Sequence, residues 1–204
     1  MLKNSKLYLI LDAEVASYDR LFEIAKESIR YGVDIVQLRD KNGLAKDILE
    51  FSRRMLKLLK NRIPYLINDR VDLAIASRAS GVHLGQDDLS IKFARKIMGK
   101  KAIIGASCQT IEHARKAEKE GANYIGFGSV FKTLTKPHRQ PMDLKLLAEV
   151  SRKIKIPVFA IGGIGIHNIL KLRTMGIQRI AVCREICCAS NIKRTAMLLK
   201  KSLE

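Results

Sequence analysis

The sequence contains no tryptophan, few aromatic residues, and far fewer acidic than basic side chains, 20 against 38. The formal net charge is +18, and a surplus of this size suggests a polyanionic partner such as a nucleic acid. However, the Lys and Arg residues are spread almost evenly along the chain and form no dense stripe interleaved with aromatic residues. We therefore expect no nucleic-acid partner, and a positive field that speeds encounters with small phosphorylated substrates.

Long apolar runs are missing as well. No run reaches the roughly 18 to 20 residues that a membrane span requires. The first apolar run ends at Asp12 without a small-residue cleavage site, so we expect no signal peptide, no membrane partner and a cytoplasmic protein.

Cysteines are few and show no metal-binding spacing. The four residues form no CxxC pair and have no histidines at ligand spacing: Cys108, Cys183, Cys187 and Cys188. This pattern favours free thiols in a reducing compartment over a redox role, which stays open.

What the chain does have is eight short apolar runs that alternate with longer segments of helical period. The runs are residues 7–12, 34–40, 64–69, 81–85, 102–107, 123–129, 157–163 and 179–183. Helical segments include residues 18–32, 44–60, 111–121 and 143–154, with a closing helix near 191–203.

Eight strand-then-helix units predict a (β/α)8 TIM barrel, an α/β fold, as a single domain over residues 1–204. A doubly wound open sheet is the alternative. It is disfavoured because no GxGxxG turn follows the first strand. We see no linker or composition shift that would mark a second domain.

In such a barrel, chemistry takes place at the carboxyl ends of the strands. Gln37, Arg39 and Lys41 alternate after the second run, so all three should point into the barrel mouth and suit an anion. The alternative for these cations is an ion pair with an acid of a neighbouring strand.

Asp69 and Asp88 follow adjacent strands and could converge on one Mg²⁺, with water and substrate phosphates as further ligands. Asp87 could support that site or cap the following helix. Capping alone would explain one acid after the fourth run, but not the Asn68-Asp69 pair after the third.

Two further segments suit phosphate. The stretch TLTKP at 133–137 reads as a polar loop over the mouth, and the glycines at 162 and 163 allow close backbone approach. Together with the expected magnesium, these sites suggest transfer or loss of a diphosphate. We find no Ser-His-Asp or Cys-His set, and interpret His83 as structural.

The motifs VQLRDK (36–41), INDRVDLA (67–74), GVHLGQDDL (81–89), IGAS (104–107), GANYIGFGSVFKTLTK (121–136) and AIGGI (160–164) resemble the thiamine-phosphate synthase family. The resemblance extends over nearly the whole chain. It implies a (β/α)8 barrel that joins a hydroxymethylpyrimidine diphosphate to a thiazole phosphate with Mg²⁺ and releases pyrophosphate. The implied mechanism is dissociative, so the diphosphate leaves before the thiazole nitrogen attacks.

The resemblance also implies residue roles. Magnesium would be held by Asp69 and Asp88. The catalytic residues would be Lys136, Ser107 and Arg39. The pyrimidine diphosphate would be bound by Gln37, Arg39, Lys41, Asn68, Ser107 and Lys136, and the thiazole phosphate by Thr133, Thr135, Gly163, Cys183 and Arg184.

The departures from the family pattern gather on the thiazole side. Cys183-Arg184 replaces a Val-Ser or Ile-Ser pair of the family, and Lys132 replaces a proline. After the serine of the fifth run, where the family usually has His-Thr, this chain has Cys108-Gln109-Thr110. A paralogue with another phosphorylated acceptor is therefore one alternative. A thiazole tautomerase is disfavoured, because that group carries a histidine where this chain has Ser129. A non-catalytic barrel that binds a thiamine intermediate or RNA, and self-association, also stay open.

Overall fold

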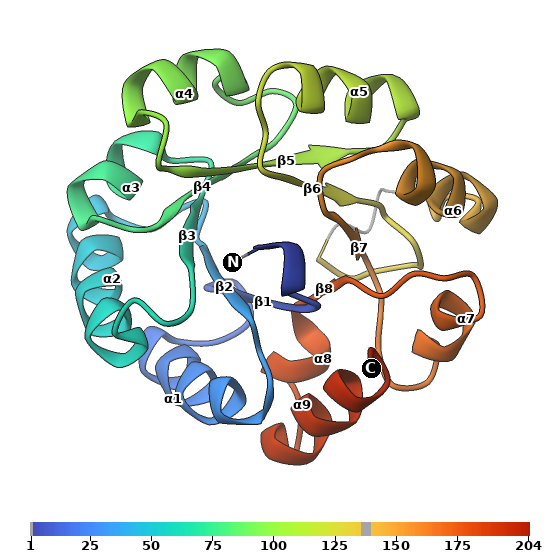
Figure 1. The fold of residues 1–204 in the computed structure, drawn as a ribbon. Coiled ribbons are helices and arrows are strands. Elements are labelled where there is room, and N and C mark those ends of the chain that lie inside the picture. The colour runs from blue at the N-terminus through green and yellow to red at the C-terminus, as the bar shows by residue number, and fades with distance from the viewer. Residues whose placement is uncertain (1, 136–139) are drawn as a thin grey trace.

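The computed structural model describes residues 2–135 and 140–204, and their strands close into a barrel surrounded by helices (Figure 1). The strands are β1 (Leu7–Asp12), β2 (Ile35–Arg39), β3 (Tyr65–Asn68), β4 (Gly81–Leu84), β5 (Ile103–Cys108), β6 (Tyr124–Phe127), β7 (Val158–Ile161) and β8 (Ile180–Val182). Each strand lies within, or within one residue of, one of the eight apolar runs.

Whether the sheet is closed distinguishes the predicted (β/α)8 barrel from the alternative, a doubly wound open sheet. All neighbouring strands pair in parallel, and β1 pairs with both β2 and β8, with Leu7 opposite Ile180. An open sheet would leave β1 or β8 with a free edge. The (β/α)8 prediction is therefore confirmed, and the doubly wound alternative is wrong.

The helices lie outside the ring of strands (Figure 1). They are α1 (Tyr18–Ser28), α2 (Ala45–Leu59), α3 (Val71–Ser77), α4 (Ile91–Met98), α5 (Ile111–Lys119), α6 (Leu144–Lys153), α7 (Ile169–Arg173), α8 (Arg184–Cys187) and α9 (Ile192–Lys201), with short 3-10 helices η1 (Leu2–Asn4) and η2 (Ile29–Tyr31). The segments of helical period correspond to α1 with η2, α2, α5, α6 and α9. Their apolar stripes pack on the barrel because an isolated helix of this length is marginal in water.

Side chains alternate in direction along each strand and so belong to two separate clusters of the core. Alternate residues such as Leu7, Leu9 and Leu11 join the large cluster between strands and helices. The residues between them, including Tyr8 and Ile10, face the barrel interior. Polar residues that continue the inward set therefore emerge at the carboxyl end of the barrel.

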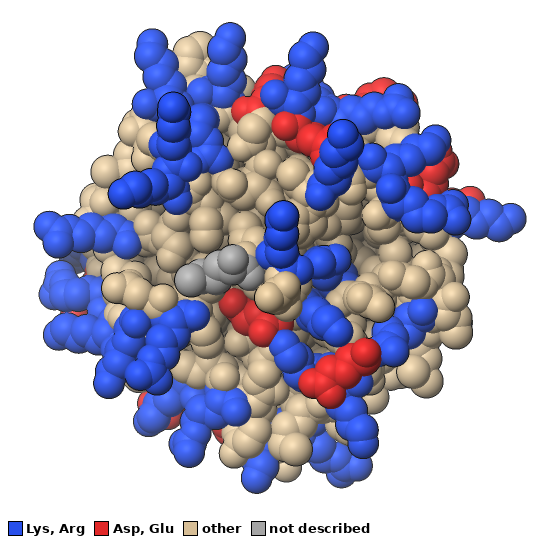
Figure 2. All heavy atoms as spheres, viewed as in Figure 1, with Lys and Arg blue, Asp and Glu red and all other residues tan. Residues whose placement is uncertain are grey.

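The amino end of the barrel is covered by the chain itself. In Figure 1, η1 lies within the ring of strands, and Leu2 packs against the interior cluster. On the face that Figure 2 shows, Lys and Arg side chains stand mostly in separate groups around the periphery. Within residues 2–135 and 140–204, no helix combines the length and apolarity that a membrane span needs.

Candidate functional site

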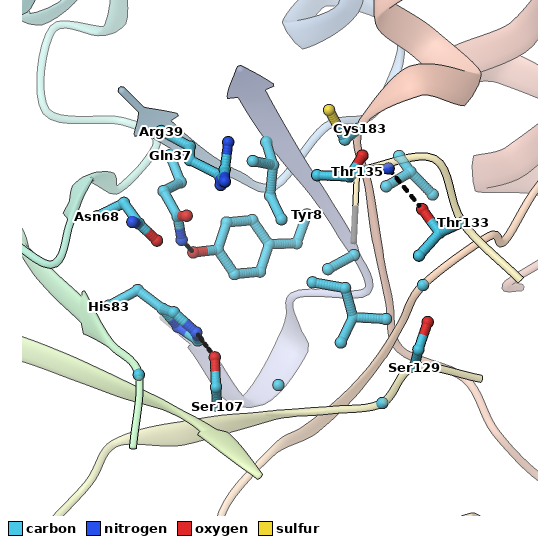
Figure 3. A pocket seen from close by; sticks show the side chains of 18 of the residues that line it. Tyr8, Gln37, Arg39, Asn68, His83, Ser107, Ser129, Thr133, Thr135 and Cys183 are labelled. Carbon is cyan, nitrogen blue, oxygen red and sulfur yellow. Dashed lines mark hydrogen bonds between the residues drawn. The ribbon is translucent and has the colours of Figure 1, made fainter. Parts of the chain in front are cut away.

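A cavity of about 360 Å³ opens at the carboxyl ends of the strands. The candidate residues named from the sequence line it, except Lys136, which lies outside the described residues: Gln37, Arg39, Lys41, Asn68, Asp69, Asp88, Ser107, Thr133, Thr135, Gly163, Cys183 and Arg184. They come from different strands and loops, and Figure 3 shows several of them around the same space. The barrel thus gathers them, although their individual roles stay predictions.

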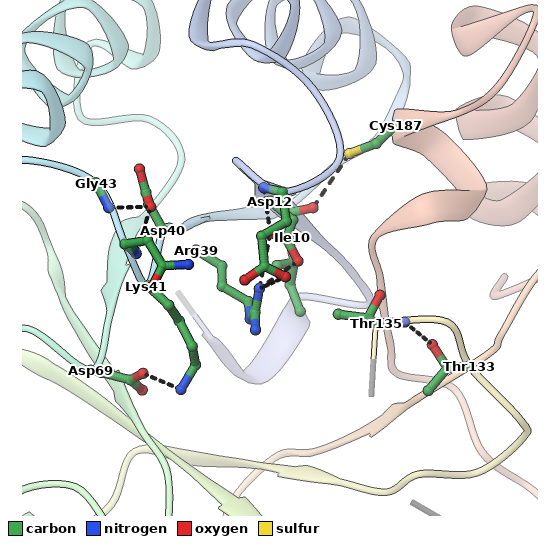
Figure 4. Close-up of polar contacts among 12 residues, drawn as sticks. Ile10, Asp12, Arg39, Asp40, Lys41, Gly43, Asp69, Thr133, Thr135 and Cys187 are labelled. Atoms are coloured by element: carbon green, nitrogen blue, oxygen red, sulfur yellow. Dashed lines mark hydrogen bonds and ion pairs between the residues drawn. The ribbon is translucent and has the colours of Figure 1, made fainter. Parts of the chain in front are cut away.

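Arg39 is fixed in the cavity wall by a buried ion pair. Its Nη1 donates to both carboxylate oxygens of Asp12, at 2.9 and 2.8 Å, and Glu14 lies 3.3 Å away (Figure 4). Asp12 is fully buried at the end of β1, and Arg39 is 8% exposed. The ion pair with a neighbouring strand, which the sequence left open, is thus present, and Arg39 still lines the cavity.

A second group of charges brings together the ends of β2, β3 and β4. Lys41 Nζ lies 3.2 Å from Asp69 Oδ2 (Figure 4). Burial, followed by the neighbouring Asp88 carboxyl, raises the pKa of Asp69, while Lys41 acts in the opposite direction. Asp69 and Asp88 therefore converge, and their repulsion is only partly offset by Lys41.

The backbone at Asp69 turns sharply to place this carboxylate. Asp69 has φ +62°, and Arg70 N–H donates to Asn68 C=O at 2.7 Å across it, which makes a three-residue turn. Non-glycine residues with positive φ are uncommon, and such backbone strain clusters at functional sites. The turn ends β3 and keeps the Asp69 side chain at the cavity.

The acids after β4 do not cap the next helix. Ser90 fills that position, and its hydroxyl accepts from Phe93 N–H at the start of α4. Asp88 instead accepts from Gly85 N–H at 2.6 Å, and Asp87 is exposed at the cavity. The capping alternative is therefore wrong for both aspartates.

His83 and Ser107 lie in contact at the floor of the cavity, a pairing that the sequence analysis did not predict. His83 Nε2 is 2.9 Å from Ser107 Oγ (Figure 3), and His83 Nδ1 is 2.9 Å from the Tyr124 hydroxyl. In a hydrolytic triad, a carboxylate orients the histidine. Here a phenol occupies that place, so the pair does not reproduce a Ser-His-Asp triad.

Glycines after β7 let two loops meet. Gly162 and Gly163 have φ +106° and +62°, and a Cβ at Gly163 would lie 2.3 Å from the Lys132 carbonyl oxygen. Thr135 N–H donates to Thr133 Oγ1 at 3.3 Å in the adjoining loop. The backbone therefore approaches closely, as expected for these glycines.

The end of β8 places a thiol and a cation at the rim. Contact with Cys187, followed by burial, raises the pKa of Cys183, so it is a thiol at neutral pH. Arg184 is exposed at the start of α8, and Glu185 accepts from Ile166 N–H at 2.8 Å, which fastens the loop after β7. All four cysteines of the chain are free.

Several residues at the site were not singled out from the sequence. Tyr8 and Glu185 line the cavity, and Asp12 and Tyr124 hold side chains that do. The period of two in LYLILD places Tyr8, Ile10 and Asp12 on one face, which could have indicated a polar end to the first strand. No comparable signal marks Glu185.

The expected metal site consists of two carboxylates in the structure. Among the described residues, no group of three or more His, Cys, Asp or Glu side chains is arranged to hold a metal ion. Asp69 and Asp88 supply oxygen donors of the kind that Mg²⁺ accepts, and Mg²⁺ usually keeps water and substrate phosphates as its other ligands. The pair fits an ion that arrives with a phosphorylated substrate better than a site formed by the protein alone.

The chain is similar to known proteins over most of its length. A family profile described as thiamine monophosphate synthase matches residues 7–186. The chain is 42% identical over 205 residues to a thiamine-phosphate synthase of Halalkalibacterium halodurans, covering 100% of this chain and 97% of that protein. It is 39% identical to a protein of the same name from Fusobacterium nucleatum, covering 98% of each.

A solved structure is similar as well. A thiamine phosphate pyrophosphorylase from Pyrococcus furiosus superposes with a TM-score of 0.88 at 34% identity, covering 97% of this chain and 95% of that one. A 3-hexulose-6-phosphate synthase, at 17% identity and a TM-score of 0.69, shares the fold alone. By its profile match, its full-length relatives and this structure, the chain belongs to the thiamine monophosphate synthase family.

Proposed function

We propose that the cavity joins 4-amino-2-methyl-5-hydroxymethylpyrimidine diphosphate to a thiazole phosphate, with Mg²⁺, and releases pyrophosphate. The family and the transferase activity named by the relatives support the reaction. The observation that carries the site assignment is the convergence of Asp69 and Asp88 in a cavity also lined by Arg39 and Lys41.

The reaction requires stabilisation of charge more than proton transfer. The bond between the pyrimidinylmethyl carbon and the diphosphate oxygen breaks, and its electron pair leaves with the diphosphate. The lone pair of the thiazole nitrogen then forms the new carbon–nitrogen bond, so no proton has to be removed from the attacking atom. A cavity that positions cations around a diphosphate suits this chemistry.

Mg²⁺, when bound, would neutralise charge on the departing diphosphate. Asp69 and Asp88 would hold it. Lys41, which lies 3.2 Å from Asp69, is placed either to balance the carboxylates or to contact the diphosphate. Arg39 is held in place by Asp12, so little side-chain entropy would be lost when it meets an anion.

The second substrate would lie across the cavity from these acids. Gly162, Gly163 and the loop of Thr133 and Thr135 form its wall, and the cation of Arg184 stands at the rim. Neutral Cys183 offers no charge to a phosphate, so we assign phosphate attraction on this side to Arg184. A cytoplasmic location, the absence of a nucleic-acid partner and self-association stay predictions.

The test is pyrophosphate release with both substrates and Mg²⁺. Asp88→Asn keeps an oxygen that can accept from Gly85 N–H but removes the charge, so we expect kcat/KM to fall by roughly 10²-fold or more. Asp72→Asn is the matched control, because Asp72 is an exposed acid on α3 whose carboxylate accepts from Arg70 and does not line the cavity. Turnover that survives a chelator, or equal losses in both variants, would refute the proposal.

A further inference from the structure

A chain of side-chain hydrogen bonds crosses the barrel interior beneath the cavity. Gln37 Nε2 donates to the Tyr8 hydroxyl, which lies 2.8 Å from the Tyr124 hydroxyl. Tyr124 in turn lies 2.9 Å from His83 Nδ1, and His83 Nε2 lies 2.9 Å from Ser107 Oγ. Figure 3 shows both ends of this chain, Gln37 and Ser107, at the cavity. We call these five residues the interior chain.

One direction lets every hydroxyl of the interior chain both donate and accept. In it, the Tyr8 oxygen accepts from Gln37 Nε2 and the Tyr8 hydroxyl donates to Tyr124. The Tyr124 hydrogen then goes to His83 Nδ1, which acts as an acceptor. His83 therefore carries its hydrogen on Nε2 and donates it to Ser107.

Burial keeps the two phenol hydroxyls of the interior chain, Tyr8 and Tyr124, protonated. Tyr8 is 2% exposed and Tyr124 is fully buried, and this burial raises the pKa of both phenols. Both therefore stay protonated at neutral pH.

Small residues make room for the interior chain. A Cβ at Gly105 would lie 2.3 Å from the Tyr124 hydroxyl oxygen, and one at Gly126 would lie 3.4 Å from His83 Cε1. Strands β5 and β6 thus lack side chains where the bonds pass. The arrangement is specific to these side chains, because a larger residue at Gly105 would displace the phenol.

We propose that Tyr124 and His83 are positioning residues, which hold Ser107 so that its hydroxyl hydrogen points into the cavity as a fixed donor to the diphosphate substrate. The Ser107 oxygen accepts from His83, so its own hydrogen is left for the ligand. Tyr124 does not line the cavity and acts only through its neighbours. This inference rests on the proposed function, and on the contact between Ser107 and the pyrimidine diphosphate that the family resemblance implies.

The first test is Tyr124→Phe, which removes one oxygen and interrupts the interior chain. We expect kcat/KM to fall by about 10-fold, the equivalent of one neutral hydrogen bond. Tyr65→Phe is the matched control, because Tyr65 is equally buried and its hydroxyl lies 3.1 Å from Ser52 Oγ, outside the interior chain. We expect Tyr65→Phe to leave kcat/KM unchanged.

A double-mutant cycle separates positioning from a general structural role. Once Ser107→Ala has removed the donor, Tyr124→Phe should change kcat/KM by less than about twofold. A fall by the same factor in both backgrounds would show that Tyr124 acts independently of Ser107, and would overturn the proposal.

The tautomer of His83 provides a readout that needs neither substrate nor turnover. In ¹⁵N-histidine-labelled protein at pH 7, the signal missing from His83→Gln identifies His83, and we expect its hydrogen on Nε2. A hydrogen on Nδ1, or on both nitrogens, would overturn the direction of the interior chain even if Tyr124→Phe fails to fold. If the wild type makes no thiamine phosphate, the proposed function fails, whereas this spectrum still tests the interior chain.

Discussion

The buried ion pair between Asp12 and Arg39 gives the sharpest stability prediction. Asp12→Asn keeps the size of the side chain and an acceptor for Glu14 N–H, which donates to Asp12 Oδ1 at 3.0 Å. It removes the charge that faces Arg39 at 2.8 Å. Breaking one side of a buried pair costs about 3–5 kcal/mol, because the remaining charge is left uncompensated. We expect the lower end, about 3 kcal/mol, because Glu14 stays 3.3 Å from Arg39.

For a chain of this length, about 3 kcal/mol corresponds to a fall in Tm of roughly 6 to 12 °C. Asp19→Asn is the matched control. Asp19 pairs with Arg54 at 2.7 Å, but its side chain is 86% exposed, so we expect a cost below about 1 kcal/mol. The nitrogen–oxygen distance is nearly the same in the Asp12–Arg39 and Asp19–Arg54 pairs, so the comparison isolates the effect of burial.

The assay is equilibrium urea unfolding of both variants, at low and high salt. Added salt should reduce the effect of Asp19→Asn and leave that of Asp12→Asn nearly unchanged. Asp12→Asn combined with Arg39→Met should cost less than the sum of the single changes, since no buried charge remains unpaired. If Asp12→Asn and Asp19→Asn lower the free energy of unfolding equally, burial is not what gives this pair its effect.

Three further predictions concern the cavity and the interior chain beneath it. Gly163→Ala places a methyl group at φ +62° and 2.3 Å from a carbonyl oxygen, so steady-state kinetics should show KM for the thiazole phosphate rising by roughly 10-fold, with little change for the diphosphate substrate. Gly105→Ala should lower Tm and activity together, because the methyl group would overlap the Tyr124 ring. In the proposed site, metal binding requires the ionised Asp69 carboxylate, whose pKa is raised. As the pH is lowered, Mn²⁺ affinity measured by calorimetry should therefore start to fall at a higher pH than for an ordinary aspartate. Lys41→Met, which removes the cation that lowers this pKa, should move the fall to still higher pH; no shift would contradict the assigned contact.

The strands could be predicted well because each is short, apolar and followed by a helical segment. The period of two also predicted that Gln37, Arg39 and Lys41 share a face, and all three line the cavity. The motifs also predicted the family correctly, as the profile match and the full-length relatives show. These signals are local, so they can be read without knowing how the strands are arranged in space.

Contacts between distant strands could not be read in that way. The sequence left open whether Arg39 meets a phosphate or an acid, and only the register of β1 against β2 places Asp12 opposite Arg39. The aspartates after β4 were ambiguous until Ser90 was seen to cap α4.

The sequence by itself therefore determined the repeating strand and helix units, the shared face of Gln37, Arg39 and Lys41, and the family. Only the tertiary structure decided which inward side chains touch, such as His83 with Ser107 and Tyr124. Those contacts depend on the stagger of the strands around a closed sheet, a property of all eight together that no single segment encodes.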